Sequence, residues 1–433
     1  MSNILYLPTR YFPSISGAEF YFQRIAEILT RMYNYKIDIF TSNAIDFKAL
    51  RNPKGRIIGS NNKIFNKVNS LKINRYPINY NNTEEETFQI LKNIHFFNAL
   101  NLKEDCVKKI IRNGPFLGNL LDFFIENKTL NYDLVHSTFF PYFNLIISLI
   151  VGKIKEIPTV CTPFFHFSNP RYSDPSLVSI LKNFDCIIAC TNLEKRILVE
   201  KFNLQEKKIQ VIPMGVDFDK FETIHKTKLT NYYFKETFFN KLEKKYKLVL
   251  FVGYKNYEKG AISILKSIPF ILKKVKKVYF VFIGPSTLAF NLELSKIKKL
   301  EDVKIINFTP ENLTGYFDKK KLTAFKEADI YLMPSRSDAF GISFLEAWAS
   351  GKPVIGARIG ATPEVIRENI DGFLVEFDKP KDIAHKVIKL LKNKKKRKKF
   401  GRAGQIRVSQ KFTWDIVVKK THVTYQKLLK LSG

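Results

Sequence analysis

The stretch from Ile330 to Glu364 constrains the fold of this 433-residue chain more than any other part of it. It begins with a short apolar run, Ile330–Met333, which has the length and composition of a buried strand. After a loop of Pro, Ser, Asp and Gly, an apolar pattern over Ile342–Ser350 predicts a helix that ends at Gly351. Pro353–Ala357 is typical of a second buried strand. Strand, loop, helix and strand in this order predict an α/β crossover in a parallel sheet.

The loop before the predicted helix has the chemistry of an anion site. Gly341 lets a ligand approach the backbone closely, and the first N–H groups of the helix carry its positive dipole end. Such a helix start binds diphosphates. Ile342 and Glu346 share one helix face, and a carboxylate there can accept two hydrogen bonds from a vicinal diol such as ribose. The spacing alone also permits a plain role for Glu346 in capping or decorating the helix start.

The run D-A-F-G-I-S-F-L-E resembles the E-x7-E signature of the retaining nucleotide-sugar glycosyltransferases of the GT-B fold, family 4 type, also called glycosyl transferases group 1. The resemblance implies that Glu346 binds the donor ribose and that Asp338, which replaces the first Glu, faces the donor sugar. Asp338 is shorter than Glu by one methylene, about 1.5 Å of reach. The donor-binding residues implied in this run are Asp338, Phe340, Gly341, Ile342, Ser343 and Glu346.

A second motif lies at G-Y-K-N-Y-E-K-G, where the family has G-R-x4-K-G with an Arg and a Lys that clamp the diphosphate. Lys259 matches the Lys, while Tyr254 occupies the Arg position and removes a bidentate donor. We expect Tyr254 and Lys259 to lie at the donor and the neighbouring Lys255 to compensate for the missing Arg. Without the resemblance, Lys259 would be one more solvated lysine.

Two features of the first half of the chain belong to the same resemblance. Asn3–Leu7, a loop and a helical pattern open a Rossmann-like domain, and Gly17 lies where the family has a Gly-Gly loop against the donor phosphates or the acceptor. A plain strand-to-helix turn is the alternative there. His166 follows the predicted strand Pro158–Thr162 in T-P-F-F-H, which is similar to the family's T-P-F-H stretch, whose His contacts the donor sugar. A lone His is otherwise often structural, and we favour His166 over His136 for this role.

The chain is long enough for two domains. The run I-P-M-G-V-D-F-D-K-F resembles the family's inter-domain stretch I-P-N-G-V-D-x3-F. We therefore expect an α/β protein with two Rossmann-like domains facing each other across a cleft: an acceptor domain at 1–216, a nucleotide-sugar domain at 217–412, and a helix at 413–433 that crosses back to the first domain. Locally, Thr83–Gly118 has a helical pattern, Thr223–Tyr246 is typical of a linker or surface helix, and the basic run Lys394–Lys399 is typical of a solvated face or turn.

The formal net charge of +32 has several explanations. It reflects either Lys-rich coding habits or attraction to anionic lipids or substrates. A nucleic-acid partner is not expected, because the Lys residues are spread along the chain without a nucleic-acid motif. Four Cys residues without a metal-site pattern are expected to be buried free thiols, and the longest apolar run, Leu145–Val151, is far short of the roughly 20 residues of a membrane span. No signal peptide is recognised at the N-terminus. These features predict a cytoplasmic protein, with peripheral attachment to the inner face of a membrane as an option.

Together these patterns predict a glycosyltransferase of glycan biosynthesis that moves a sugar from a nucleotide-sugar to a carbohydrate or lipid-linked acceptor with retention of configuration. The expected catalytic residues are His166, Lys259 and Asp338, with no metal and no cofactor beyond the nucleotide-sugar substrate. Two alternatives stay open: a nucleotide-sugar epimerase or phosphorylase of the same fold, and a basic binding protein that has lost catalysis, as the changes at Tyr254 and Asp338 permit.

Overall fold

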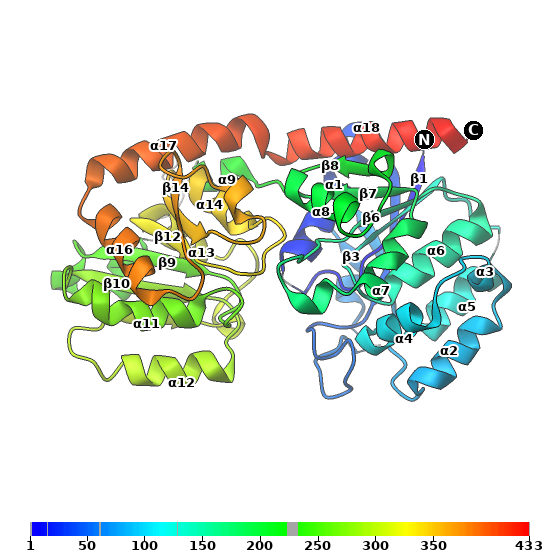
Figure 1. Cartoon of the computed structure of the whole chain (residues 1–433), viewed down its shortest axis with the longest axis horizontal. Coiled ribbons are helices and arrows are strands. Elements are labelled where there is room, and N and C mark those ends of the chain that lie inside the picture. Colours follow the sequence, from blue (N-terminus) through cyan, green and yellow to red (C-terminus); the bar gives the residue numbers. More distant parts are fainter. Residues whose placement is uncertain (1, 15, 60–61, 128, 223–232, 433) are drawn as a thin grey trace. The chain divides into compact units, whose positions relative to one another are not determined.

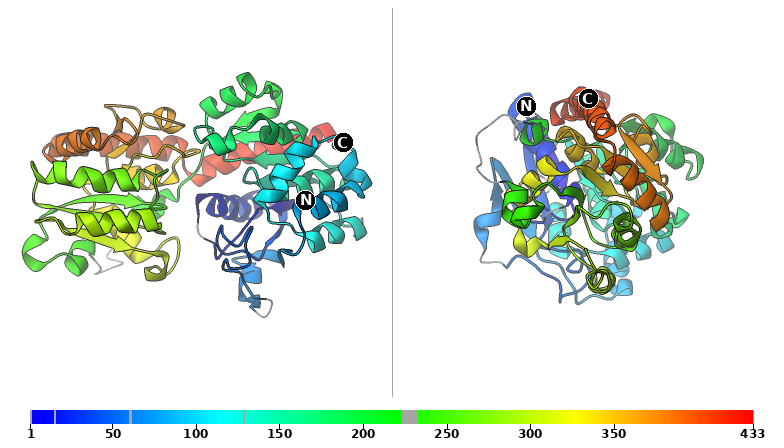
Figure 2. Two further views of the ribbon diagram at one scale, coloured as in Figure 1. Left: turned by 60° about the horizontal axis from the view of Figure 1, so that its bottom comes forward. Right: turned by 90° about the vertical axis from the view of Figure 1, so that its left-hand side faces the viewer.

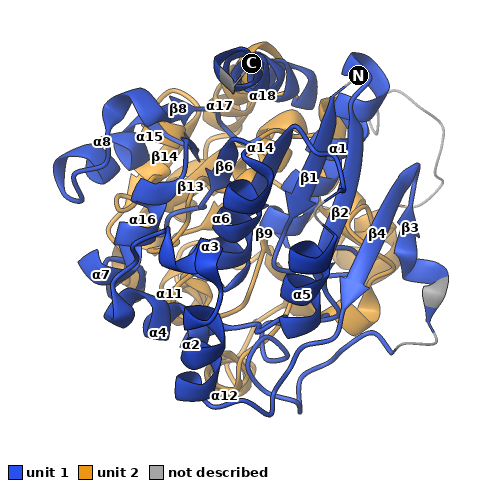
Figure 3. Cartoon of the chain, turned by 90° about the vertical axis from the view of Figure 1, so that its right-hand side faces the viewer, with its two compact units in different colours: residues 1–214, 414–433 blue, residues 215–413 orange. Residues whose placement is uncertain are grey.

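The computed structural model describes residues 2–14, 16–59, 62–127, 129–222 and 233–432. The chain forms two compact units, which Figure 3 shows in different colours. Unit 1 comprises residues 1–214 and 414–433, and unit 2 comprises residues 215–413. Part of the predicted linker or surface helix, residues 223–232, lies outside the described residues.

Unit 1 is built on an eight-stranded sheet in the order β3-β4-β2-β1-β5-β6-β7-β8. All its pairings are parallel except that of β3 with β4. Helices flank the sheet on both faces (Figures 1 and 2). The strands are β1 Asn3–Leu7, β2 Lys36–Ser42, β3 Lys67–Val68, β4 Leu71–Tyr76, β5 Leu134–Thr138, β6 Thr159–Thr162, β7 Cys186–Ala189 and β8 Ile209–Val211. The helices are α1 Gly17–Tyr33, α2 Glu84–Lys92, α3 His95–Asn98, α4 Glu104–Asn113, α5 Gly118–Glu126, α6 Asn144–Lys155, α7 Pro175–Val178, α8 Asn192–Glu200 and α18 Trp414–Ser432.

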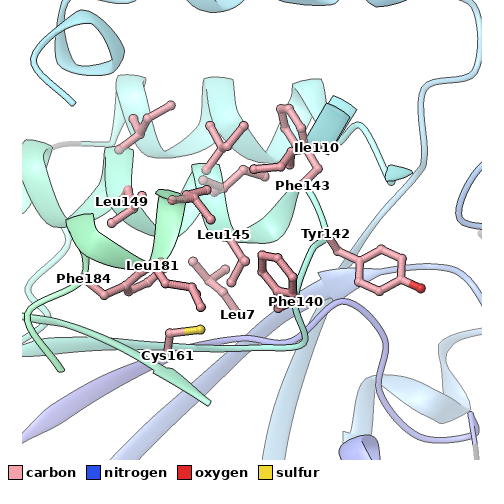
Figure 4. Close-up of a cluster of buried hydrophobic side chains, with 14 of the residues drawn as sticks. Leu7, Ile110, Phe140, Tyr142, Phe143, Leu145, Leu149, Cys161, Leu181 and Phe184 are labelled. Carbon is pink, nitrogen blue, oxygen red and sulfur yellow. The ribbon is translucent and has the colours of Figure 1, made fainter. Parts of the chain in front are cut away.

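The central strand β1 is apolar on both sides because helices cover both faces of the sheet. Leu5 and Leu7 face one way and join a large core with α5 and α6. Tyr6 faces the other way, where its ring stacks at 4.3 Å on that of Phe22 of α1. Burying each large apolar side chain contributes about 1.5–3 kcal/mol. Figure 4 shows part of the first core, with Leu7, Ile110, Phe140, Phe143, Leu145, Leu149, Cys161, Leu181 and Phe184.

The C-terminal helix α18 belongs to unit 1 and packs against α1. A buried polar chain ties it to the sheet. The Tyr425 hydroxyl lies 2.9 Å from the Tyr6 hydroxyl and 2.5 Å from Nδ1 of His136. The other nitrogen of His136, Nε2, lies 2.8 Å from Oγ1 of Thr162. His136 is therefore a structural residue that joins β5, β6 and α18.

The buried His136 is expected to make the free energy of unfolding depend on pH. Burial lowers the pKa of His136 to about 3, so the folded protein holds the ring neutral. The unfolded chain takes up a proton near pH 6.5, so stability is present above this pH and is lost as the pH falls from about 6.5 toward 3. We expect this residue to lower the free energy of unfolding by about 1.4 kcal/mol between about pH 7.5 and pH 5.5.

Urea unfolding at the two pH values measures this difference. His136→Gln should remove that part of the pH dependence, whereas the same change at the exposed His385 should leave it in place. An unchanged pH dependence in His136→Gln would contradict the assignment.

Unit 2 contains a six-stranded parallel sheet in the order β11-β10-β9-β12-β13-β14. Its strands are β9 Lys247–Val252, β10 Val278–Ile283, β11 Ile305–Phe308, β12 Ile330–Met333, β13 Val354–Ala357 and β14 Gly372–Val375. Its helices are α9 Phe218–Glu222, α10 Phe234–Phe238, α11 Ala261–Leu272, α12 Leu288–Ile297, α13 Lys319–Glu327, α14 Ile342–Ala349, α15 Thr362–Val365, α16 Pro380–Leu391 and α17 Lys394–Lys411. The two sheets with their helices confirm the predicted α/β class with two Rossmann-like domains.

The structure refines two local predictions. The helical pattern of Thr83–Gly118 forms three helices, α2, α3 and α4: Asn101, with a left-handed backbone, lies between α3 and α4, and Gly114-Pro115 ends α4. The basic run Lys394–Lys399 is mostly exposed, as predicted for a solvated face, and it forms the first part of the 18-residue helix α17, which packs on α14. Asn393 caps that helix by accepting a hydrogen bond from the Lys396 backbone N–H at 2.8 Å.

Candidate functional site

The candidate site of unit 2 lies where neighbouring parallel strands end. β9 and β12 pair in the middle of the sheet, and the loops 253–260 and 334–341 follow their carboxyl ends. Ligands of open α/β sheets bind at this edge. Gly260 lies so close to the second loop that a Cβ would come within 2.2 Å of the Pro334 carbonyl oxygen, and its φ of 73° also requires glycine. The two loops are therefore in direct contact.

Lys259 and Asp338, 79 residues apart, form an ion pair between these loops. The Lys259 ammonium lies 2.7 Å from Oδ2 of Asp338 and 2.9 Å from the Ser337 carbonyl oxygen. Their side chains are 22% and 15% exposed, so both remain within reach of a ligand. The structure thus brings two predicted site residues together and shows that Asp338 is also the counterion of Lys259.

The helix α14 begins directly after this loop, as predicted. Gly341 is its N-cap, with a φ of 93°, and no side chain caps the first N–H groups of the helix. Phe340, Gly341 and Ile342 are buried. Ser343 lies in the first turn, with its hydroxyl 3.5 Å from the Met333 sulfur.

Glu346 lies deeper than its predicted role suggests. Its side chain is 2% exposed, and Oε1 accepts a hydrogen bond from the Lys321 ammonium at 2.7 Å. The Tyr316 hydroxyl also hydrogen-bonds to Glu346. Sequence reasoning missed Lys321 and Tyr316. A signal existed for Lys321, because it lies three and four residues before Ala324 and Phe325 and so on the buried face of α13.

The structure corrects one prediction about the missing Arg. Lys255 does not reach out to compensate for Tyr254: its side chain is fully buried, and its ammonium donates to Oδ1 of Asn307 at 2.5 Å and to the Phe308 carbonyl oxygen at 2.9 Å. Burial lowers the pKa of Lys255 to about 8. Lys255 thus ties the end of β9 to the end of β11, while the neighbouring Tyr254 is 46% exposed.

The remaining candidates lie in unit 1. His166 follows the carboxyl end of β6, and its ring lies 5.4 Å from that of Tyr172. The buried Glu194 accepts a hydrogen bond from the Phe165 backbone N–H at 3.2 Å and so fixes the backbone next to His166. Gly17 is the first residue of α1.

Sequence reasoning also missed a buried ion pair near Gly17. Arg10 and Glu19 lie 2.7 Å apart and are 4% and 5% exposed. The Arg10 guanidinium stacks 3.7 Å from the Phe47 ring centroid. Nothing in the sequence spacing singled this pair out, because Arg10 lies in an irregular loop.

The described residues also bear on metal binding, membrane insertion and the state of the cysteines. No group of three or more His, Cys, Asp or Glu side chains there is arranged to hold a metal ion. No described helix is long and apolar enough to cross a membrane. The four cysteines lie buried as free thiols.

Known proteins resemble this chain along nearly its whole length. A family model described as glycosyl transferases group 1 matches residues 234–407, and one described as glycosyltransferase family 4 matches residues 104–220. An uncharacterised glycosyltransferase of Methanocaldococcus jannaschii is 25% identical, with 99% of each chain covered. A D-inositol 3-phosphate glycosyltransferase of Corynebacterium jeikeium is 25% identical over 73% of this chain and 77% of its own length.

Solved structures share the fold. HepE of Anabaena, in complex with UDP and glucose, superposes with a TM-score of 0.71 at 14% identity, covering 99% of this chain and 100% of its own. A glycosyltransferase of Rickettsia africae gives a TM-score of 0.70 at 19% identity, covering 99% of each chain. These structures share the GT-B fold of two Rossmann-like domains. The two family models, which together match residues 104–220 and 234–407, identify the family: the chain belongs to the group 1, family 4-type glycosyltransferases.

Proposed function

We propose that this glycosyltransferase moves a sugar from a nucleotide-sugar to a carbohydrate or lipid-linked acceptor with retention of anomeric configuration. The observation that carries the proposal is that Lys259 pairs with Asp338 in the loop directly before α14, the helix that carries Glu346. An ammonium and a helix N-terminus suit a diphosphate, and a carboxylate suits a ribose diol. The solved complexes of HepE with UDP and with UDP-glucose support a donor of this class.

In the proposed reaction, Lys259 and the N–H groups at the start of α14 stabilise the charge that develops on the leaving diphosphate. Electrostatic stabilisation of this kind is usually the largest single contribution to catalysis. Asp338 holds Lys259 in place before the donor arrives, and it faces the donor sugar once the diphosphate shares the ammonium. Ser343 and the backbone of residues 340–342 complete the donor site, with Tyr254 at its edge. We assign no enzymic nucleophile.

A screen of UDP-, GDP- and ADP-sugars with candidate acceptors tests this function, with mass spectrometry to detect a new glycosidic bond and NMR to assign its configuration. We expect transfer from one nucleotide class with retention, and we expect it to continue in EDTA because Lys259 and the helix dipole supply the positive charge. A donor converted without a new glycosidic bond to an acceptor indicates an epimerase or a phosphorylase, and binding without turnover indicates a decayed enzyme. Loss of activity in EDTA that Mg²⁺ restores contradicts metal independence.

His166 is the proposed contact to the donor sugar from unit 1. We expect His166→Ala to lower kcat by about 10²-fold, within the range for a positioned polar group, and to change the affinity for the free nucleotide little. Steady-state kinetics and calorimetry separate the two effects. His95, an exposed histidine of α3, provides the matched control as His95→Ala. Full turnover in His166→Ala, at an unchanged melting temperature, would assign His166 a structural role.

We also propose cytoplasmic location with peripheral attachment to an anionic membrane surface, supported by the net charge of +32. Such attraction amounts to about 1 kcal/mol for each Lys or Arg near the surface. Sedimentation with neutral and anionic vesicles at low and high salt tests it, and equal sedimentation with both would contradict it.

A further inference from the structure

The Lys321–Glu346 pair places two charges almost out of reach of water. The atoms Nζ and Oε1 lie 2.7 Å apart, and the side chains are 8% and 2% exposed. The pair joins α13 to α14, the helices before and after β12. A lysine is rarely buried to this degree.

Tyr316 closes the arrangement. The Lys321 ammonium lies 3.7 Å from the centroid of its ring, which is the geometry of a cation–π contact. The Tyr316 hydroxyl hydrogen-bonds to Glu346. Burial, aided by the charge of Glu346, raises the pKa of Tyr316 well above its usual value, so the hydroxyl keeps its proton and donates it. Among the described residues, this carboxylate therefore has two side-chain partners, an ammonium and a phenol.

Stability alone does not account for these charges. Replacing a buried ion pair by apolar side chains of similar volume is often neutral or stabilising. Burying these two charges costs desolvation free energy and adds little net stability, so the pair has a role other than stability. Glu346 belongs to α14, the helix that begins at the proposed donor site.

This inference rests on the proposed function: we propose that Lys321 is the positioning residue that lets Glu346 select the ribose of the nucleotide. A carboxylate offers about four lone-pair positions. Lys321 and Tyr316 occupy two of them, which leaves two for the vicinal hydroxyls of one ribose. The ammonium also stabilises the negative charge of Glu346 in a buried place, so that both hydroxyls meet a charged acceptor. Lys321 itself does not touch the nucleotide.

Calorimetry with UDP and 2′,3′-dideoxy-UDP tests the inference, because only the first ligand has the diol. Wild-type protein is expected to prefer UDP by roughly 10- to 150-fold, the value of one or more charge-assisted hydrogen bonds. Lys321→Met should reduce this preference at least tenfold and leave the affinity for dideoxy-UDP within about twofold. Lys319→Met is the matched control, since Lys319 is an exposed lysine at the start of the same helix.

A second variant protects the test against simple unfolding. Lys321→Met leaves Glu346 buried without its cation, so we compare Glu346→Gln with Lys321→Met/Glu346→Gln, in which both charges are gone. If Lys321 acts only through Glu346, these two variants bind UDP equally within about twofold. Melting temperatures accompany each measurement.

The outcomes separate the inference from the proposed function. The inference would be overturned if Lys321→Met kept the wild-type preference for UDP over dideoxy-UDP. It would also be overturned if Lys321→Met/Glu346→Gln bound UDP more weakly than Glu346→Gln, because Lys321 would then contact the nucleotide directly. Wild-type protein that binds none of UDP, GDP and ADP contradicts the proposed function instead. If GDP or ADP is the ligand that binds, its own 2′,3′-dideoxy form takes the place of dideoxy-UDP.

Discussion

Lys259→Met is expected to lower the rate of sugar transfer by roughly 10²- to 10³-fold, the usual effect of removing one preorganised group that stabilises developing charge. The physical reason is that the Lys259 ammonium lies between the loops after β9 and β12 and has only Asp338 and the Ser337 carbonyl as partners among the described residues. The ammonium can therefore bind a diphosphate by exchanging only these two contacts. The change should also weaken binding of the free nucleoside diphosphate, because the diphosphate is common to donor and product.

Steady-state kinetics with the donor found in the screen measures the first effect, and calorimetry measures the second. Lys266→Met is the matched control, since Lys266 is an exposed lysine of the following helix α11. A Lys259→Met enzyme that keeps its turnover would remove the central cation from the proposed mechanism. Asp338→Asn does not test the proposed sugar contact separately, because it also removes the counterion of Lys259.

Glu346→Ala is expected to weaken binding of the free nucleoside diphosphate by roughly 10- to 150-fold, since charge-assisted hydrogen bonds contribute about 1.5–3 kcal/mol each. The same change leaves the Lys321 ammonium buried without its carboxylate. Breaking a buried pair in this way costs about 3–5 kcal/mol of stability. The variant should therefore show both weaker binding and a lower urea midpoint.

Calorimetry at a temperature well below the melting transition isolates the binding effect. Glu301→Ala, at an exposed glutamate in the turn after α12, is the control for losing one negative charge from unit 2. If Glu346→Ala remains folded and binds the nucleotide as tightly as the wild type, Glu346 is a purely structural residue and the donor ribose must be held elsewhere.

The local elements of this protein follow directly from the sequence. Short apolar runs such as Ile330–Met333 became buried strands because parallel strands covered on both faces must be apolar throughout. Gly341 ended the loop and started α14 as predicted, since its backbone needs a positive φ. The order of strands and helices, with its family motifs, was enough to predict two Rossmann-like domains.

What the sequence could not decide is which polar side chains meet. Lys255 and Lys259 are four residues apart in one loop, yet one is fully buried against Asn307 and the other remains within reach of a ligand. The reason is that Asn307 and Asp338 reach this edge only through strand pairing, β11 through β10 and β12 directly beside β9.

The same holds for the partners of Glu346. Helical periodicity places Lys321 on the inner face of α13 but does not say what it meets there, since 25 residues separate it from Glu346. The composition and order of the sequence therefore determined the two domains and the place of the proposed anion site. Only the tertiary structure decided which lysine remains within reach of a ligand and which one pairs with Glu346, because hydrogen bonds and ion pairs act over about 3–4 Å and depend on packing between distant segments.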